Sequence, residues 1–62
     1  MSSRDQALEA TLTCIANGGM KGFTVEDVAR QAGLSRATIY RYFPGGRDEL
    51  VSSAVTLAVV EF

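Results

Sequence analysis

The stretch from Thr24 to Phe43 holds two short helical patterns separated by a single glycine. In the first pattern, apolar residues fall at i, i+3, i+4 and i+7, which places them on one face of a helix. These residues are Val25, Val28, Ala29 and Ala32. Gly33 follows directly, and glycine ends helices because it adopts left-handed backbone angles at the least cost. The stretch therefore predicts two short helices joined by a tight turn, a helix-turn-helix over about 24–43.

Both predicted helices have capping residues at their starts. Thr24 suits the N-cap of the first helix, and Asp27 three residues later completes a weak capping box. Ser35 suits the N-cap of the second. The apolar residue before each cap also has a partner at hydrophobic-staple spacing, in the pairs Phe23 with Val28 and Leu34 with Ile39.

The second helix has an apolar face predicted to point inward and a polar face predicted to point outward. Ile39 and Phe43 are one turn apart, so their side chains are predicted to face the core. The other side chains are of types that contact DNA, because arginine binds guanine edges, hydroxyls hold phosphates and alanine fits a thymine methyl. They are Arg36, Ala37, Thr38, Tyr40 and Arg41. A helix of this length spans roughly 12 Å, close to the width of the major groove, so we predict that it enters that groove.

The charge distribution agrees with a DNA partner, although the net charge is −1. Positions 28–47 contain no Asp or Glu but hold four of the six basic residues, namely Arg30, Arg36, Arg41 and Arg47. Local charge, rather than total charge, decides whether a surface attracts phosphates. We expect Arg30 to form an exposed ion pair with Glu26, one turn earlier, rather than to contact DNA.

Ahead of this motif the sequence predicts an amphipathic helix that acts as support. Ser3 and Gln6 form a capping-box pattern, and Asn17-Gly18-Gly19 ends the helix. Its apolar face contains Leu8, Leu12 and Ile15. We expect Arg4 to be a solvated charge rather than part of a flexible arm that touches phosphate, whereas Lys21, in the following loop, is placed to contact the DNA backbone with low specificity.

After the motif, Phe43-Pro44-Gly45-Gly46 predicts a break, because the residue before proline leaves the α region and two glycines follow. A fourth helix is expected from near Arg47, where Asp48 and Glu49 suit the positive end of the helix dipole. Arg47 is unfavourable at that end, and a DNA phosphate shared with Tyr40 would account for it.

The fourth helix is apolar around most of its circumference. A core stripe is predicted at Leu50, Ala54, Leu57 and Ala58. Little polar face remains, because further apolar residues occupy the other sides, at Val51, Val55, Val59, Val60 and Phe62. Such a helix needs cover on every side, so we expect the chain to be a fragment of a longer protein whose remainder covers it.

Length and composition exclude several classes of protein. A chain of 62 residues forms one small domain without a large ligand cavity. With no His and one Cys there is no metal-ligand or catalytic constellation, so neither an enzyme nor a cofactor is expected. Cys14 is predicted to be a small buried hydrophobe. The first twenty residues lack a signal-peptide core and the run Ala54 to Val60 is too short to span a bilayer, which favours the cytoplasm and no membrane partner.

The chain resembles the N-terminal DNA-binding domain of the TetR-type bacterial transcriptional repressors. The resemblance is carried by Phe23-Thr24-Val25, Val28-Ala29, Ala32-Gly33-Leu34-Ser35, Ala37-Thr38-Ile39-Tyr40-Arg41-Tyr42-Phe43 and Arg47-Asp48-Glu49-Leu50. It implies an all-α fold, a three-helix bundle with its helix-turn-helix in helices 2 and 3, plus the start of a fourth helix. Residues 1–46 would form the DNA-binding domain, and residues 47–62 would lead to an absent C-terminal domain that forms a homodimer and, in the full-length protein only, binds a small-molecule effector.

The resemblance also implies roles for individual residues on a double-stranded DNA operator. Arg36 and Ala37 would face bases, and phosphate or backbone contacts are implied for Thr24, Thr38 and Tyr40. The complete predicted DNA-binding set is Thr24, Arg36, Ala37, Thr38, Tyr40, Arg41 and Arg47.

One departure from the family and two alternatives remain open. Many family members carry a lysine at the start of helix 4, whereas this chain has the longer Pro44-Gly45-Gly46-Arg47, in which Arg47 would replace it. A LacI-type headpiece or another helix-turn-helix module shares part of the pattern, although the helix ahead of Thr24 and the Tyr40-x-x-Phe43 ending favour the TetR type. A protein-interaction module that uses the apolar fourth helix is the other alternative.

Overall fold

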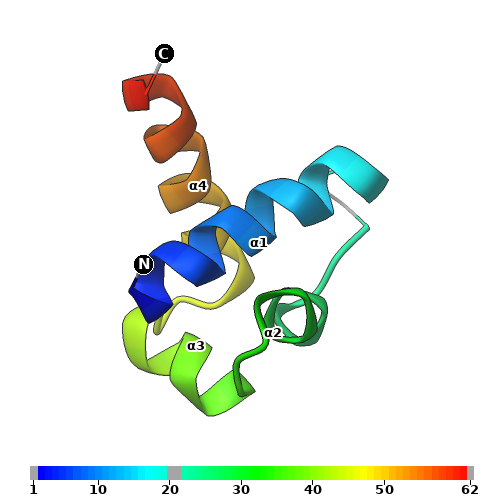
Figure 1. The fold of residues 1–62 in the computed structure, drawn as a ribbon, viewed down its shortest axis with the longest axis vertical. Coiled ribbons are helices and arrows are strands. Elements are labelled where there is room, and N and C mark those ends of the chain that lie inside the picture. Colours follow the sequence, from blue (N-terminus) through cyan, green and yellow to red (C-terminus); the bar gives the residue numbers. More distant parts are fainter. Residues whose placement is uncertain (1, 20–21, 62) are drawn as a thin grey trace.

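The computed structural model describes residues 2–19 and 22–61, so Lys21 and Phe62 lie outside the described residues. It contains four α-helices, which are α1 (Ser3–Gly18), α2 (Val25–Ala32), α3 (Arg36–Tyr42) and α4 (Arg47–Glu61). α1 crosses the middle of the molecule and packs against each of the other three, and α2 also packs against α3 (Figure 1). The predicted all-α fold with a helix-turn-helix in α2 and α3 is confirmed.

The hydrophobic core lies where these helices meet. It contains Ala7, Leu8, Ala10, Phe23, Val25, Val28, Ala29, Ile39, Phe43, Leu50 and Ala54. All four helices contribute residues to the core, so loss of any one helix would expose part of it. The predicted inward face of α2 is confirmed, with Ala32 half-buried at the rim. The buried hydroxyl of Thr11 donates a hydrogen bond to the Ala7 carbonyl at 2.8 Å, which satisfies the polar group inside the core.

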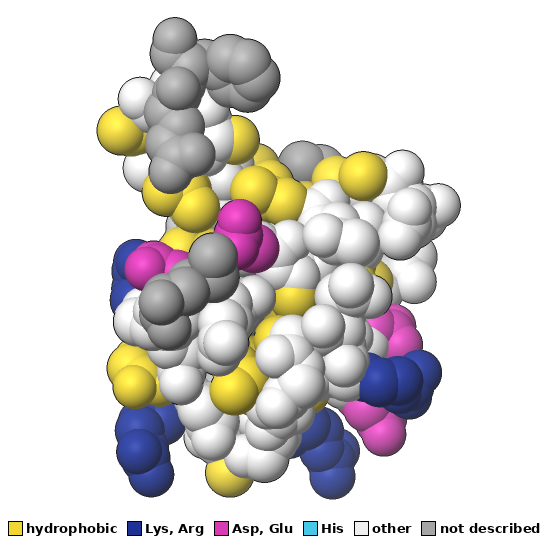
Figure 2. All heavy atoms as spheres, in the orientation of Figure 1, with side chains coloured by type: hydrophobic (Ala, Val, Ile, Leu, Met, Phe, Trp, Pro, Cys, Tyr) yellow, Lys and Arg dark blue, Asp and Glu magenta, His cyan; other side chains and the backbone are white. Residues whose placement is uncertain are grey.

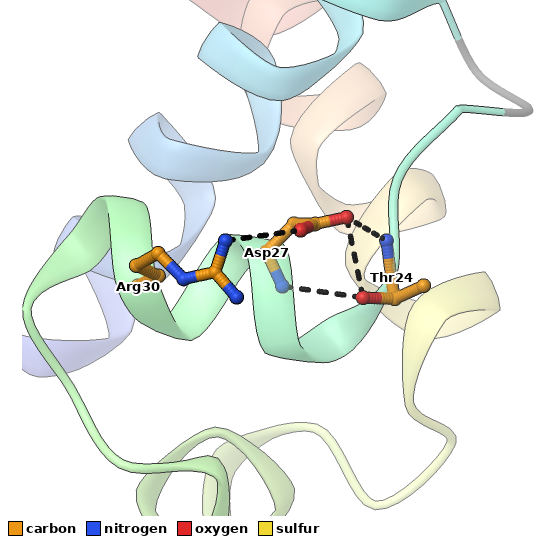
Figure 3. Close-up of polar contacts among 3 residues, drawn as sticks. All are labelled: Thr24, Asp27 and Arg30. Atoms are coloured by element: carbon orange, nitrogen blue, oxygen red, sulfur yellow. Dashed lines mark hydrogen bonds and ion pairs between the residues drawn. The ribbon is translucent and has the colours of Figure 1, made fainter.

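Both ends of α2 are closed by local hydrogen bonds. The Thr24 hydroxyl accepts the Asp27 N–H at 3.2 Å while the Asp27 carboxylate accepts the Thr24 N–H at 2.9 Å, which confirms the capping box (Figure 3). At the other end Gly33 has φ 72° and ψ 30°, and the Leu34 N–H reaches the Ala29 carbonyl at 2.9 Å. This bonding is that of a Schellman motif, which requires the left-handed conformation that glycine adopts most easily.

α3 is only seven residues long and is held in place by its ends and its inner face. The Ser35 hydroxyl accepts the Thr38 N–H at 3.1 Å, as expected of an N-cap. Ile39 and Phe43 are almost completely buried, which confirms their predicted inward direction. Isolated helices this short do not form in water, so the conformation of α3 comes from packing.

The break between α3 and α4 is also confirmed, and it is an ordered turn. The Gly46 N–H donates to the Phe43 carbonyl at 2.9 Å, and the Glu49 carboxylate accepts the Gly45 N–H at 2.7 Å. Gly46 has φ 72°, and its carbonyl accepts the first backbone bond of α4, from Leu50 at 2.9 Å. The turn therefore fixes the start of α4 relative to the end of α3.

Two predictions for α1 require correction. Its N-cap is Ser2, which accepts the Asp5 N–H at 3.1 Å, rather than Ser3, because Ser2 and Asp5 have the same spacing one residue earlier. Arg4, as expected, is an exposed charge rather than a flexible arm: it lies in the first turn of the helix, with its guanidinium carbon 5.6 Å from the centroid of the Phe43 ring. Cys14 is half-buried at the core rim rather than buried.

α4 changes character along its length. Leu50 and Ala54 are buried against the core, whereas Val59 and Val60 are 70% and 74% exposed. Its C-terminal part extends beyond the rest of the molecule in Figure 1, and Figure 2 shows apolar side chains along it. Within the described residues, no helix combines the length and hydropathy needed to cross a membrane.

Candidate nucleic-acid interface

The outward side of α3 presents side chains that suit DNA. Because Ile39 and Phe43 hold the inner side in the core, four of the predicted contact residues are exposed: Arg36, Ala37, Tyr40 and Arg41. The spacing i, i+1, i+4 and i+5 keeps these four on one side of a helix. Thr38 is half-buried, at the edge of this surface. In Figure 2, basic side chains gather at the end of the molecule where Figure 1 places α3.

An open recess of about 310 Å³ lies between the starts of α2 and α4 and one side of α3. Its lining, which we call the α2–α3–α4 recess, consists of Thr24, Val25, Glu26, Arg36, Tyr40 and Arg47. The fold therefore brings together four of the predicted contact residues from three helices, while Ala37, Thr38 and Arg41 lie outside this lining. Two guanidinium groups and two hydroxyl groups around one recess suit an anionic ligand such as a phosphate.

Tyr40 lies against the turn between α3 and α4. A Cβ atom at Gly46 would lie 3.3 Å from Cε1 of Tyr40 and 3.9 Å from Cγ2 of Val25, so only glycine leaves the ring its present position. Tyr40 nevertheless remains 48% exposed. Its ring is thus supported on one side and open to a ligand on the other.

The two threonine hydroxyls of the predicted set have capping roles. The Thr24 hydroxyl accepts the Asp27 N–H and donates to the Asp27 carboxylate, both at 3.2 Å. The Thr38 hydroxyl shares a hydrogen bond with the Ser35 hydroxyl at 2.9 Å. Each threonine hydroxyl is therefore already hydrogen-bonded at the start of a helix. A phosphate that binds either hydroxyl has to do so alongside this capping hydrogen bond.

Arg47 is engaged within the fold, by contacts that the sequence analysis did not predict. Its Nε–H donates to the Phe23 carbonyl at 3.0 Å, and its guanidinium carbon lies 4.9 Å from the centroid of the Phe23 ring. A terminal nitrogen also lies 3.8 Å from the Asp48 carboxylate. These contacts give a structural reason for a positive residue at the start of α4, and its contact with a phosphate stays a prediction.

The acidic residues also lie differently from the prediction. Glu26 precedes the acid-free stretch in sequence, yet it lines the recess beside Arg36 and Arg47, so the basic surface does contain an acid. Arg30 pairs with Asp27 at 3.8 Å instead of with Glu26 (Figure 3). The capping box fixes the Asp27 carboxylate so that its second oxygen lies within reach of Arg30, which explains the change of partner.

Cys14 lies apart from this surface, beside Phe23 and Asp27. Burial, and to a lesser extent the Asp27 charge, raise the pKa of its thiol. A raised pKa disfavours the reactive thiolate. Within residues 2–19 and 22–61, no cluster of three or more His, Cys, Asp or Glu residues is placed to hold a metal ion.

A short outward-facing helix, fixed by caps and core on its other sides and bordered by a basic recess, defines a helix-turn-helix DNA-binding domain. The sequence profile of the bacterial regulatory proteins of the tetR family matches residues 7–54. The chain belongs to this family of DNA-binding transcription regulators, and the match favours it over a LacI-type headpiece.

Individual relatives agree with this assignment. The regulator BetI 1 of Chromohalobacter salexigens is 40% identical over 52 residues, which cover 84% of this chain and 25% of the relative. PksA of Bacillus subtilis is 39% identical over 54 residues, 87% of this chain and 26% of the relative. An uncharacterized HTH-type transcriptional regulator of Mycobacterium tuberculosis is 38% identical over 45 residues, 73% of this chain and 24% of the relative.

The chain thus spans about a quarter of the length of the curated relatives it matches. No solved structure matches it significantly.

Proposed function

We propose that α3 enters the major groove of a double-stranded DNA operator, with Arg36 and Ala37 facing base edges. The observation that carries this proposal is the burial of Ile39 and Phe43, since it directs the opposite side of α3 outward. Arginine can make a bidentate pair with a guanine edge, and alanine can contact a thymine methyl. In this position Arg41, on the same exposed side, contacts the DNA backbone.

The α2–α3–α4 recess then binds the phosphates of one strand. Thr24, Tyr40 and Arg47 supply hydroxyl and guanidinium donors from the three helices that border it, and Thr38 adds a hydroxyl at the edge of α3. Contacts of this kind fix the register of a protein on the duplex, while base contacts provide its sequence preference. The recess and the exposed side of α3 share Arg36 and Tyr40, so the proposed phosphate contacts adjoin the proposed base contacts.

For the intact protein we propose a cytoplasmic regulator, a repressor, that acts by binding rather than by catalysis. Its region beyond this domain would form a homodimer and take up a small-molecule effector. The exposed valines of α4, Val55, Val59 and Val60, support cover by further protein. A homodimer would read two half-sites about one helical turn apart, or a multiple of that distance, because its two-fold symmetry has to match that of the operator.

Selection of bound sequences from a random duplex pool tests the base contact. With the intact protein, Arg36→Ala should relax the preference at one position of each half-site and cost about 1–3 kcal/mol of binding free energy. Arg30→Ala is the matched control, because Arg30 is an exposed arginine on α2 that pairs with Asp27. An unchanged sequence profile for Arg36→Ala would show that this residue does not contact a base.

A further inference from the structure

Arg47 connects two parts of the chain that are 24 residues apart in sequence. It is the first residue of α4, and its partner Phe23 directly precedes the N-cap of α2. The hydrogen bond from Nε to the Phe23 carbonyl is 3.0 Å long, and the guanidinium lies over the Phe23 ring. Because Phe23 is buried in the core, this contact ties the start of α4 to a fixed point beside the start of α2.

The neighbours of this contact are two of the proposed phosphate-binding residues. Thr24 follows Phe23 directly, so its backbone is continuous with the carbonyl that Arg47 binds. Tyr40 lies against Gly46, the residue before Arg47. A change in the direction of the first turn of α4 would therefore move the support of Tyr40 and release the peptide that leads into Thr24.

We propose that Arg47 is a positioning residue for DNA binding, which acts through Phe23 and Gly46 to hold Thr24 and Tyr40 at the spacing that one DNA strand requires. This role is separate from any charge that Arg47 presents to a phosphate. The proposal rests on the proposed function of the α2–α3–α4 recess.

Arginine suits this role better than lysine does. A guanidinium is planar and carries five N–H donors, so it can stack on the Phe23 ring, donate Nε–H to the Phe23 carbonyl and keep terminal donors for another acceptor. A lysine ammonium is a compact charge on a flexible stem and reproduces only part of this arrangement. Arg47→Lys therefore keeps the positive charge while it removes the fixed geometry.

The experiment compares the intact protein with its Arg47→Lys and Arg30→Lys variants. Arg30→Lys is the control, because it makes the same chemical change at an exposed site. Operator affinity is measured over a range of salt concentrations, at a temperature where every variant is fully folded. A contact that only stabilised the fold would leave the affinity unchanged under those conditions. Amide hydrogen exchange, followed by mass spectrometry without DNA, reports on residues 23–29, and the largely buried residues 7–11 of α1 provide an internal reference for global unfolding.

For Arg47→Lys we expect an affinity loss of roughly tenfold, the order of one charge-assisted hydrogen bond. The slope of log affinity against log salt should stay the same, because the number of neutralised phosphates does not change. Exchange should become faster in residues 23–29 and not in residues 7–11, and Arg30→Lys should show neither effect.

Arg47→Lys with wild-type affinity would overturn the positioning role, whatever happens to exchange, and would leave the proposed function intact. A loss of affinity accompanied by unchanged exchange in residues 23–29 would also overturn it, because the change would then not act through the start of α2. Failure of the wild-type protein to bind any duplex would instead overturn the proposed function itself.

Discussion

Replacement of Gly46 by alanine should reveal how far the recess depends on the turn before α4. Gly46 and Gly33 both have φ 72°, so alanine at either site has the same left-handed strain of about 1–2 kcal/mol. The two sites differ in their surroundings. An added Cβ at Gly33 meets nothing within 4 Å, whereas at Gly46 it lies 3.3 Å from Cε1 of Tyr40.

The Tyr40 ring therefore has to move by a few tenths of an ångström in Gly46→Ala, and a side chain pushed off its rotamer costs up to about 0.5–1.5 kcal/mol. We expect the free energy of unfolding to fall by about 1–2 kcal/mol in Gly33→Ala. In Gly46→Ala it should fall by about 0.5–1.5 kcal/mol more. Because Tyr40 belongs to the proposed phosphate-binding set, Gly46→Ala should also weaken operator binding at a temperature where the protein remains folded.

Urea unfolding of the two variants and the wild-type chain, followed by circular dichroism, measures these free energies from the midpoint and slope. Equal losses at both sites would show that the Tyr40 ring moves aside without cost, so that Gly46 does not hold it in place. No loss at either site would contradict the left-handed conformation of both glycines. The difference between the variants is more informative than either value, because the shared strain cancels.

Two further predictions concern charged or ionisable groups. Glu26→Gln removes the acid from the lining of the recess and should tighten operator binding by about two- to fivefold at low salt. The free energy of unfolding should fall by about 0.3–1 kcal/mol, because an acid leaves the first turn of α2. Glu9→Gln, on α1, is the control, and equal affinities for Glu26→Gln and wild type would place Glu26 away from the bound strand. Burial, followed by the Asp27 charge, raises the pKa of Cys14, so the contribution of the thiol to stability is complete at neutral pH and is lost as the pH rises through the folded-state pKa. Urea midpoints measured across alkaline pH should therefore fall more steeply for wild type than for Cys14→Ala. Identical pH profiles for the two proteins would contradict the raised pKa.

The helix starts and ends could be predicted because they depend on residues close together in sequence. The capping box of Thr24 with Asp27, the glycine end at Gly33 and the cap at Ser35 each involve residues within a few positions of one another. The Ser2 cap of α1 was missed by one residue, since two adjacent serines offer similar spacing to a polar partner. Which of the two serines caps the helix depends on the backbone angles at its start, and the sequence pattern does not give these angles.

The contents of the recess could not be predicted in the same way. Glu26 lies beside Arg36 and Arg47 because α2, α3 and α4 meet there, and the acid-free stretch of sequence gave no indication of this. The contact between Arg47 and Phe23 spans 24 residues and involves a backbone carbonyl, which every residue possesses. The one indication in the sequence was a basic residue at the positive end of a helix, and the structure shows a partner for it within the chain.

The recess exists only because three local structures converge. A capping box orients Thr24, the burial of Ile39 and Phe43 turns Tyr40 outward, and the Gly46 turn starts α4 at Arg47. None of these structures stands alone, because α3 has too few residues to form an independent helix and the core draws on all four helices. α1 supplies the surface on which the other helices pack, although the recess lining includes none of its residues. The geometry of the proposed DNA-binding surface is therefore set largely by residues outside the proposed contact set.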